Sequence, residues 1–374
     1  MRFIFEAHPP QLGLVILLIS CSVTAMTCQK QNESVPAIFV FGDSIVDTGN
    51  NNYITTIAKC NFPPYGRDFA AGGFQPSGRF SNGLVPSDFI AEIFGVKNTL
   101  PPYLDPNLQL QELLTGVSFA SGGAGYDPLT SKIPGALSLS DQLDKLREYQ
   151  KKIREAVGEN RTERIISKSI YIVCLGSDDI ANTYIPFRRS EYDIPSYTDL
   201  MASQAFNFLK ELYGVGGRRI GVVSMPIIGC VPSQRTTGGG IRRACSDSEN
   251  EAAILFNKKL LSQTKLLNKQ FPDARIVYLD IYNILDQMIQ NPAKYDFEVV
   301  DRGCCGTGTI EASLSCNSLS INTCTDESNY IFWDAYHPTE KAYKIITSMA
   351  VWVRLVAETE IETGRLRFSI VFIG

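Results

Sequence analysis

The apolar run AIFVF occupies residues 37–41 and stops at Gly42. Four more short apolar runs follow along the chain, at residues 117–120, 169–175, 219–224 and 275–281. They are rich in β-branched side chains, show no strict alternation of apolar and polar positions, and most are bounded by glycine or proline. This pattern is typical of strands that are buried on both faces of a parallel sheet. We therefore expect five strands in one mostly parallel sheet.

Helical periodicity fills the intervals between these strands. Residues 139–157 have apolar side chains on one face, begin near Ser140 and reach Gly158 at their end, as a helix does. The other expected helices are residues 199–213, 246–271 and 339–353. Alternating strands and helices predict a single α/β domain, with helices on both faces of the sheet and ligands at the carboxyl ends of the strands. The glycine- and proline-rich stretches 61–83 and 225–240 are expected to be long surface loops.

The composition excludes several classes of protein. The 374 residues are 44% hydrophobic and 20% charged, which is typical of a folded protein with a sizeable core and not of a disordered chain. Lysine and arginine number 35 and aspartate and glutamate 39, so the net charge is −4. The chain therefore lacks the positive field with which proteins bind nucleic acid or anionic membranes. We expect no nucleic-acid partner and a monomer.

The N-terminus has the layout of a secretory signal. The apolar run LGLVILLI at residues 12–19 is too short to span a bilayer comfortably, Arg2 precedes it, and small residues follow it up to Ala25. We expect residues 1–25 to be removed and residues 26–374 to form the secreted protein, with a retained anchor as the alternative. No later segment is long and apolar enough to cross a membrane.

Nine cysteines remain after that cleavage, at positions 28, 60, 174, 230, 245, 304, 305, 316 and 324. Export into an oxidising compartment favours disulfides, although the four cysteines between 304 and 324 leave a zinc site as a competitor. Nine is odd, and Cys174 lies in an apolar run, so we expect Cys174 to be a free buried thiol. Asn32 and Asn160 lie in N-x-S/T motifs that are open to glycosylation after export.

Two short motifs carry candidate catalytic groups. Ser44 follows the first strand in FGDSIVDTGNN, residues 41–51, where its hydroxyl is either an exposed nucleophile or a helix N-cap. Asp334 and His337 lie three residues apart in FWDAYHPTE, residues 332–340, and their side chains can project from one side of a turn. His337 is the only histidine left after signal cleavage. If the protein uses a serine–histidine pair, the base is His337, with Asp334 to orient it; otherwise His337 caps the following helix.

Two further strand ends offer hydrogen-bond donors for a developing oxyanion. The second strand ends in SGGA, residues 121–124, where glycine lets the backbone approach a substrate closely. The third ends in GSDD, residues 176–179. Either sequence is also compatible with an ordinary turn at the end of a strand.

Taken together and in this order, the blocks FGDSIVDTGNN, SFASGGAG, LGSDD and FWDAYHPTE resemble those of the GDSL esterase/lipase family of the SGNH hydrolase superfamily, in its plant branch. The resemblance extends over residues 37–353, and four local matches support it: PPYGRDF at 63–69, GRFSNG at 78–83, GCVPSQR at 229–235 and CCGTG at 304–308.

The resemblance implies a flavodoxin-like three-layer α/β/α fold and hydrolysis of esters without metal or other cofactor. It assigns the Ser-His-Asp triad to Ser44, His337 and Asp334. It assigns oxyanion donors to the backbone N–H groups of Ser44 and Gly123. Lipid esters, cutin and acetylated wall polysaccharides all fit the family as substrates, and the location it implies is the apoplast or cell wall.

Asp178 departs from the family pattern, because the family has an asparagine at this place whose amide is the third oxyanion donor. An ionised carboxylate has no proton to donate. Either burial and the neighbouring Asp179 keep Asp178 protonated, so that it donates through its O–H, or the enzyme works slowly with two donors. The second case leaves open a weakly active or inactive protein that binds to the cell wall. The residues 355–374 also extend beyond the usual family end, and the apolar stretch 365–374 has no assigned role.

Overall fold

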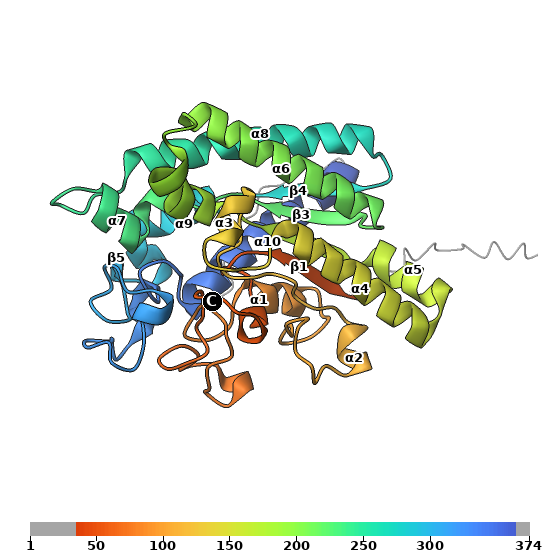
Figure 1. Ribbon diagram of the computed structural model, residues 1–374, viewed down its shortest axis with the longest axis horizontal. Coiled ribbons are helices and arrows are strands. Elements are labelled where there is room, and N and C mark those ends of the chain that lie inside the picture. Colours follow the sequence, from red (N-terminus) through yellow and green to blue (C-terminus); the bar gives the residue numbers. More distant parts are fainter. Residues whose placement is uncertain (1–34, 364–374) are drawn as a thin grey trace, which may run out of the picture. The chain divides into compact units, whose positions relative to one another are not determined.

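The computed structural model describes residues 35–363, built around a four-stranded parallel sheet in the order β1-β2-β3-β4 (Figure 1). The strands are β1 (Ile38–Gly42), β2 (Ile170–Cys174), β3 (Arg219–Val223) and β4 (Arg275–Leu279). Ile38 pairs with Ile170, which pairs with Arg219, so the strands start in register and their carboxyl ends meet at one edge. All five residues of β1 and of β2 are buried, as the continuous apolar runs predict.

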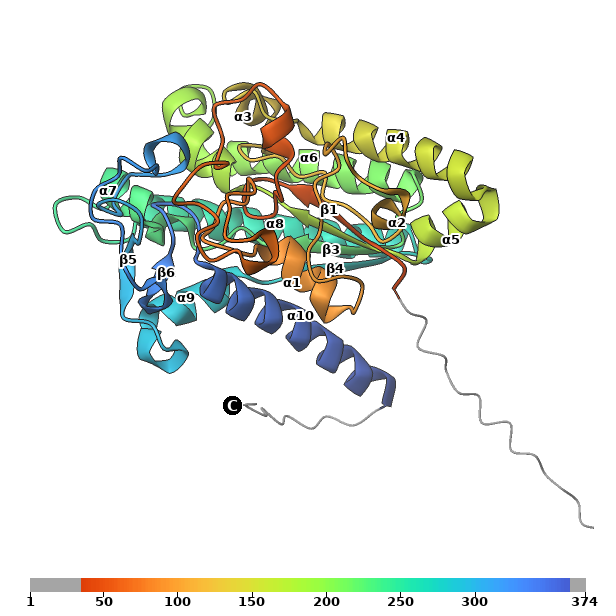
Figure 2. The same cartoon turned by 90° about the horizontal axis from the view of Figure 1, so that it is seen from below.

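Helices cover both faces of this sheet, which gives the three layers expected from the sequence (Figure 2). One face is covered by α4 (Leu139–Val157), α6 (Ile194–Gly214) and α8 (Asp247–Gln270), and the other by α1 (Pro86–Ile93), α9 (Tyr282–Gln290) and α10 (Glu340–Thr363). The shorter helices are α2 (Leu110–Leu113), α3 (Pro128–Lys132), α5 (Glu159–Lys168), α7 (Pro232–Gly238) and the π-helix η3 (Asp179–Arg188). The carboxyl ends of the four strands therefore face the same end of the molecule.

Helix α4 shows how local sequence sets these boundaries. Its cap is Ser138 rather than the expected Ser140: the Ser138 hydroxyl accepts from the N–H of Asp141, while the Asp141 carboxylate accepts from the N–H of Ser138. This reciprocal pair satisfies two donors that a helix start leaves free. The helix ends at Gly158, as predicted, and buries Leu143, Leu146 and Ile153 against the sheet.

The expected fifth strand, residues 117–120, is not a strand of the sheet. It runs beside β1, where the N–H of Val40 donates to Val117 and the N–H of Phe119 donates to Val40, but only Ser118 forms a bridge. Ser118 also bridges to Pro102 on its other side. The segment is too short between Gly116 and the following glycines to build a ladder in both directions, so the sheet has four strands and not five.

The two glycine- and proline-rich stretches are surface loops only in part: residues 70–75 and 237–238 are exposed, but much of the remainder is buried. Within residues 61–83, Tyr65, Arg79 and Phe80 are buried, and both guanidinium ends of Arg79 donate to the Asp88 carboxylate. Most of residues 225–235 are buried too, and α7 continues from them. Glycine and proline here mark irregular backbone that is packed inside the fold, since buried side chains and ion pairs satisfy its polar groups.

A small second sheet carries the cysteine-rich part of the chain. Strands β5 (Val299–Gly303) and β6 (Tyr330–Phe332) pair in parallel, and disulfides join Cys304 to Cys324 and Cys305 to Cys316. A third disulfide joins Cys230 to Cys245. The clustered cysteines are therefore paired with one another, as favoured over a zinc site.

Cys174 is free and buried, as expected, and so is Cys60. Cys28, Asn32, the expected signal peptide and residues 365–374 lie outside the described residues. Helix α10 continues to Thr363, ten residues beyond the predicted end. Within the described part of the chain, no helix has the length and hydropathy needed to cross a bilayer.

Candidate active site

Ser44 lies directly beyond the carboxyl end of β1, in a turn and not at the start of a helix. The chain turns away from the sheet at Gly42, where a Cβ atom would lie 2.3 Å from the carbonyl oxygen of Cys174 on β2. Only glycine allows this close approach. The N–H of Asp43 then donates to the same Cys174 carbonyl, which fixes the turn. Ser44 is therefore held at the sheet edge by the geometry of its own strand, and the N-cap alternative is wrong.

His337 reaches Ser44 from the other end of the chain. Its Nε2 atom lies 2.8 Å from the Ser44 Oγ atom, and its Nδ1 atom lies 2.8 Å from Oδ2 and 3.0 Å from Oδ1 of Asp334. All three side chains are buried. A carboxylate at Nδ1 holds the proton there, so Nε2 is free to accept the proton of the serine hydroxyl.

The Asp334 carboxylate is itself fixed by three further donors. Its Oδ1 atom accepts from the N–H groups of Tyr336 and His337, both at 2.7 Å, and its Oδ2 atom accepts from the Tyr65 hydroxyl at 2.6 Å. The Tyr65 oxygen in turn accepts from the N–H of Ser313. Sequence analysis quoted Tyr65 only as part of the PPYGRDF match; its spacing of 269 residues from Asp334 hides the contact.

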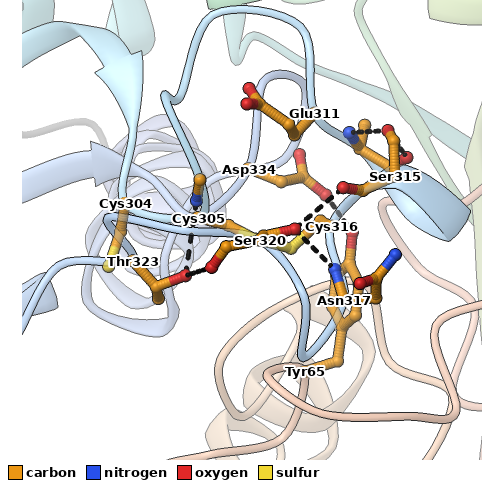
Figure 3. Close-up of a disulfide and its surroundings, with 12 residues drawn as sticks. Tyr65, Cys304, Cys305, Glu311, Ser315, Cys316, Asn317, Ser320, Thr323 and Asp334 are labelled. Carbon is orange, nitrogen blue, oxygen red and sulfur yellow. Dashed lines mark hydrogen bonds between the residues drawn. A yellow bond between two sulfur atoms is a disulfide. The ribbon is translucent and has the colours of Figure 1, made fainter.

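A cystine segment, residues 303–324, lies behind Asp334 (Figure 3). The N–H groups of Cys304 and Cys305 donate to the carbonyls of Phe332 and Trp333, immediately before Asp334. Gly303 approaches so closely that a Cβ atom would lie 2.4 Å from the Asp334 carbonyl oxygen. The disulfides thus stiffen the surface on which the catalytic carboxylate is mounted.

Two backbone N–H groups are available beside Ser44. Neither the Ser44 N–H nor the Gly123 N–H has a hydrogen-bond partner among residues 35–363. Gly123 has a φ of +86°, which favours glycine, and the preceding Gly122 is held by the Asp47 carboxylate through its N–H. Both predicted donors therefore come together at the wall of one cavity with Ser44.

The buried carboxylates Asp43 and Asp47 shape this turn. Asp47 accepts from the N–H groups of Gly49, Asn50 and Gly122, yet its burial raises its pKa to about 6. Burial, followed by the charge of Asp178, also raises the pKa of Asp43 well above its usual value. Among residues 35–363 no ion pair to Asp43 or Asp47 occurs, so burial favours the protonated form of both carboxyl groups.

Asp178 lies in the same cavity wall as Ser44, Gly123 and His337. Burial raises its pKa, against the lowering effect of a hydrogen bond from Asn182 and of the nearby His337. The Asn182 amide donates to Asp178 Oδ1 at 2.6 Å, which leaves Oδ2 to carry a proton.

Asp179 does not act as the expected charged neighbour of Asp178. Its carboxylate accepts from the N–H groups of Tyr126 and Asp127 and from the Thr130 hydroxyl, so it supports the loop that follows Gly123. The raised pKa of Asp178 comes first from burial. The expectation that Asp179 keeps Asp178 protonated is therefore wrong. The two side chains have different surroundings: Asp178 lines the open cavity, and Asp179 binds the loop that follows Gly123.

Two cavities meet at the triad, and both are lined by Ser44, Asp178, Tyr336 and His337. The open cavity has a volume of about 710 Å³ and a mixed lining that includes Gly123, Asn182, Gln234 and Glu249. The inner cavity has a volume of about 70 Å³ and lies between the sheet and α1, α9 and α10, with an almost entirely aliphatic lining. An ester bond placed at Ser44 would therefore have a different environment on each side.

Comparison with known proteins identifies the family of the chain. Residues 38–349 match the GDSL-like lipase/acylhydrolase family. The chain belongs to that family. The GDSL esterase/lipase EXL3 of Arabidopsis thaliana is 50% identical over 339 residues, which cover 90% of this chain and 92% of that protein. The Arabidopsis GDSL esterase/lipase At5g42170 is 50% identical over 315 residues, covering 84% and 85%. This GDSL protein is thus a carboxylic ester hydrolase by family, as the four sequence blocks predict.

Solved structures are more distant. An acetyl-xylooligosaccharide esterase from Geobacillus aligns over 86% of this chain and 94% of its own, with a TM-score of 0.39 and 12% identity. Phospholipase A1 from Streptomyces albidoflavus aligns over 87% and 99%, with a TM-score of 0.36 and 11% identity.

Asn160, the glycosylation candidate within the described residues, is exposed in the first turn of α5. Glycosylation of Asn160 stays a prediction. No cluster of His, Cys, Asp and Glu with the arrangement of a metal site occurs among residues 35–363.

Proposed function

We propose that this protein is a secreted serine esterase that works through an acyl-enzyme on Ser44. The observation that carries the proposal is the unbroken chain of hydrogen bonds from Ser44 Oγ through both ring nitrogens of His337 to Asp334. Such a chain activates a hydroxyl for attack on a carbonyl carbon. The free N–H groups of Ser44 and Gly123 support the same chemistry, since they can stabilise the oxyanion that forms.

In the first half of the reaction, His337 Nε2 takes the Ser44 proton as the oxygen attacks the ester carbonyl. The oxyanion accepts from the two backbone N–H groups, and His337 then donates its proton to the departing alcohol. In the second half, His337 removes a proton from water as the water oxygen attacks the acyl carbon, and it returns this proton to Ser44 Oγ as the acid is released. Asp334 keeps the imidazole in one tautomer and stabilises its cationic form throughout.

Replacement of Ser44 tests this proposal directly. Ser44→Ala should lower kcat on a p-nitrophenyl ester by about 10⁴-fold or more, with a folded protein by circular dichroism. A fluorophosphonate probe should label the parent and not the variant. The same label separates the esterase from the alternative, a wall-binding protein with an inert triad, because only an activated serine reacts. An unlabelled parent, or full activity of Ser44→Ala, would contradict the proposed mechanism.

We further propose that Asp178 is protonated when the enzyme works and donates to the oxyanion through Oδ2. Its burial and the Asn182 bond to Oδ1 support this arrangement. Because the donor is lost on ionisation, activity should decline as the pH rises through the pKa of Asp178, which favours mildly acidic conditions.

Asp178→Asn supplies a donor at every pH and is the matching test. We expect its rate at neutral pH to exceed that of the parent, and the alkaline decline of kcat to disappear or move upward. Loss of a single oxyanion donor costs about 10²–10³ in rate, so the gain should be measurable. If the parent and Asp178→Asn have superimposable pH–rate profiles, Asp178 is not a donor.

Export to the cell wall remains part of the proposal and rests on the N-terminal sequence of residues 1–25. Three disulfides are consistent with an oxidising compartment. N-terminal sequencing of the protein recovered from the apoplast should begin after Ala25, and a fusion that stays inside the cell would oppose secretion. The family implies an ester substrate, and we propose an ester of a lipid or a polysaccharide.

A further inference from the structure

One wall of the open cavity is polar and comes from α7 and the first turn of α8. Cys230, two residues before α7, is cross-linked to Cys245, two residues before α8, so the two parts are held together. We call this group of residues the polar wall, and its members that line the cavity are Ser233, Gln234, Thr237, Ser246, Ser248 and Glu249. None of them belongs to the triad or to the oxyanion donors.

Glu249 is a buried carboxyl group, 3% exposed, that its own helix does not use. Ser246 and Glu249 have the spacing of a capping box, in which the glutamate accepts from the N–H of the serine. Here the N–H of Ser246 donates to the carbonyl of Gly229, and no side chain of the described residues caps the start of α8. The Glu249 carboxyl group lines the open cavity instead.

The Gln234 amide connects Glu249 to the catalytic site. In the orientation that satisfies both residues, its NH2 group donates to the two carboxyl oxygens of Glu249, at 2.8 and 3.1 Å. Its other amide atom lies 3.4 Å from the Tyr336 hydroxyl. The Tyr336 ring lies beside that of His337, with the ring centroids 5.8 Å apart. The polar wall therefore extends from the triad to Glu249.

The charge of the cavity restricts which groups the polar wall can bind. Burial raises the pKa of Glu249 to about 7, against the lowering effect of a hydrogen bond with Ser246. In mildly acidic solution the carboxyl group is therefore largely neutral, and a neutral carboxyl group both donates and accepts hydrogen bonds. Anions are disfavoured, because Asp178 and Glu249 line the cavity and His337 is the only basic residue among its described lining.

Another part of the lining is aliphatic. Ile57 and Ile133 contribute to it, and their segments are joined by a hydrogen bond from the N–H of Ile57 to the carbonyl of Pro134. The cavity thus offers hydrogen-bonding groups on one part of its lining and carbon surface on another. A sugar ring is divided in the same way, since it has hydroxyl groups around its edge and C–H groups on its faces.

The sizes of the two cavities decide where such a ring can lie. The inner cavity, of about 70 Å³, is too small for a sugar ring, whereas the open cavity has a volume of about 710 Å³. The open cavity is also lined by His337, which donates its proton to the departing alcohol. The ring therefore belongs to the alcohol part of the ester.

We propose that Glu249 is a specificity-determining residue, which binds the hydroxyl groups of a polyhydroxylated alcohol, of the size of a sugar ring, in the open cavity. The inference rests on the proposed esterase function and adds the class of alcohol and the residue that selects it. Of the lipid and polysaccharide esters that the proposed function leaves open, it favours the polysaccharide ester.

Two acetates with the same acyl group and the same ring size measure this selection. Methyl 6-O-acetyl-glucoside has a hydroxylated ring, and cyclohexylmethyl acetate has a carbon ring without hydroxyl groups. For the parent, kcat/KM should be at least about tenfold higher for the glucoside, because a carbon ring leaves the polar wall unpaired. Equal values would overturn the inference. So would a higher kcat/KM for acetylcholine than for the glucoside, which would assign the polar wall to a cation.

Glu249 and Glu251 provide a matched pair on α8. Glu249 lines the open cavity, whereas Glu251 is exposed and does not. Glu249→Leu should lower the ratio of kcat/KM for the glucoside to that for cyclohexylmethyl acetate by about tenfold. Glu249→Gln keeps hydrogen-bonding groups and should hold this ratio within about threefold of the parent, and Glu251→Leu should leave both values unchanged. Equal losses on the two acetates in Glu249→Leu would assign Glu249 to the structure alone and overturn the inference.

Gln234→Leu keeps the test valid if Glu249→Leu does not fold. It removes the amide that orients Glu249, so the same ratio should fall by about fivefold. An unchanged ratio in Gln234→Leu would overturn the inference. Failure of the proposed function has a different signature, because then neither acetate is hydrolysed and the fluorophosphonate does not label Ser44.

Discussion

The two halves of the catalytic site are held in place by different means. The nucleophile half, around Ser44 and Gly123, is fixed by hydrogen bonds from backbone N–H groups to the buried carboxylates Asp47 and Asp179. The base half, around Asp334 and His337, rests on the cystine segment. The first half depends on protonation states and the second on covalent cross-links. A change of pH should therefore affect mainly the nucleophile half, and loss of a disulfide should affect mainly the base half.

The largest expected effect comes from opening the base half with Cys305→Ser together with Cys316→Ser. Loss of this cross-link should lower the free energy of unfolding by about 3 kcal/mol, the entropy of a loop of this length. Because Ser313 lies inside the loop and donates to the Tyr65 hydroxyl, kcat per folded molecule should also fall. Denaturant unfolding and an assay on a short-chain ester give the two quantities.

The disulfide between Cys230 and Cys245 is the control for this experiment. Its sequence separation of 15 is close to the 11 of the pair Cys305–Cys316, so the double serine variant should lose a similar free energy of unfolding. Its kcat on a short-chain ester should change less, since no residue of its loop bonds to Asp334 or Tyr65, although the N–H of Ser233 donates to Ala335. If both disulfides affect kcat equally, the cystine segment has no special role in positioning the carboxylate.

The nucleophile half should respond to pH. Burial raises the pKa of Asp47 to about 6 and that of Asp179 to about 7. These values exceed those of the unfolded chain, so the folded state binds the protons more tightly. The contribution of these two groups to the free energy of unfolding is present in full below about pH 4. It is lost as the pH rises through about 6 to 7.

We expect the melting temperature to fall by about 5 °C, or roughly 2 kcal/mol, between mildly acidic and mildly alkaline solution. Calorimetry over this range is the measurement, and Asp179→Asn is the comparison, because its pH dependence should be shallower. A melting temperature that rises with pH over this window would show that the carboxylates are ionised at little cost.

The smallest expected effect concerns the hydrogen bond from Tyr65 to Asp334, through which Ser313 of the cystine segment supports the carboxylate. Tyr65→Phe removes the hydroxyl that donates to Asp334 but keeps the ring packed near Phe80 and Trp333. Loss of one such bond corresponds to about 1 kcal/mol, or roughly a fivefold decrease in kcat. KM and the labelling of Ser44 should stay close to those of the parent. A stability loss with unchanged kcat would assign Tyr65 to packing alone.

Sequence reasoning succeeded where chemistry is tied to a strand end or a short motif. Ser44 and Gly123 follow apolar runs, and Asp334 and His337 share one turn, so local spacing and the family blocks could predict that these residues lie together. Their catalytic roles stay a prediction. Tyr65 and Asn182 were missed as parts of the site because their importance arises from contacts with Asp334 and Asp178 that only the folded chain creates.

The errors in the fold have a common physical origin. The segment 117–120 has the apolar composition of a strand, but Ser118 divides its bonds between Val40 and Pro102. The stretches 61–83 and 225–240 have the composition of loops, yet Arg79 is buried by its pairing with Asp88. Composition reports the local backbone preference, whereas burial depends on partners elsewhere in the chain.

The cystine segment has a part that is fixed by a disulfide and a part that is exposed to solvent. Its stem is closed at Cys304 and Cys324, next to Asp334, while its outer part exposes Ile310, Leu319 and Ile321, and Ile310 borders the open cavity. Residues in the outer part can therefore change in size or number while the disulfides keep the stem fixed. Substitutions in this exposed part should therefore alter the open cavity that Ile310 borders without displacing Asp334.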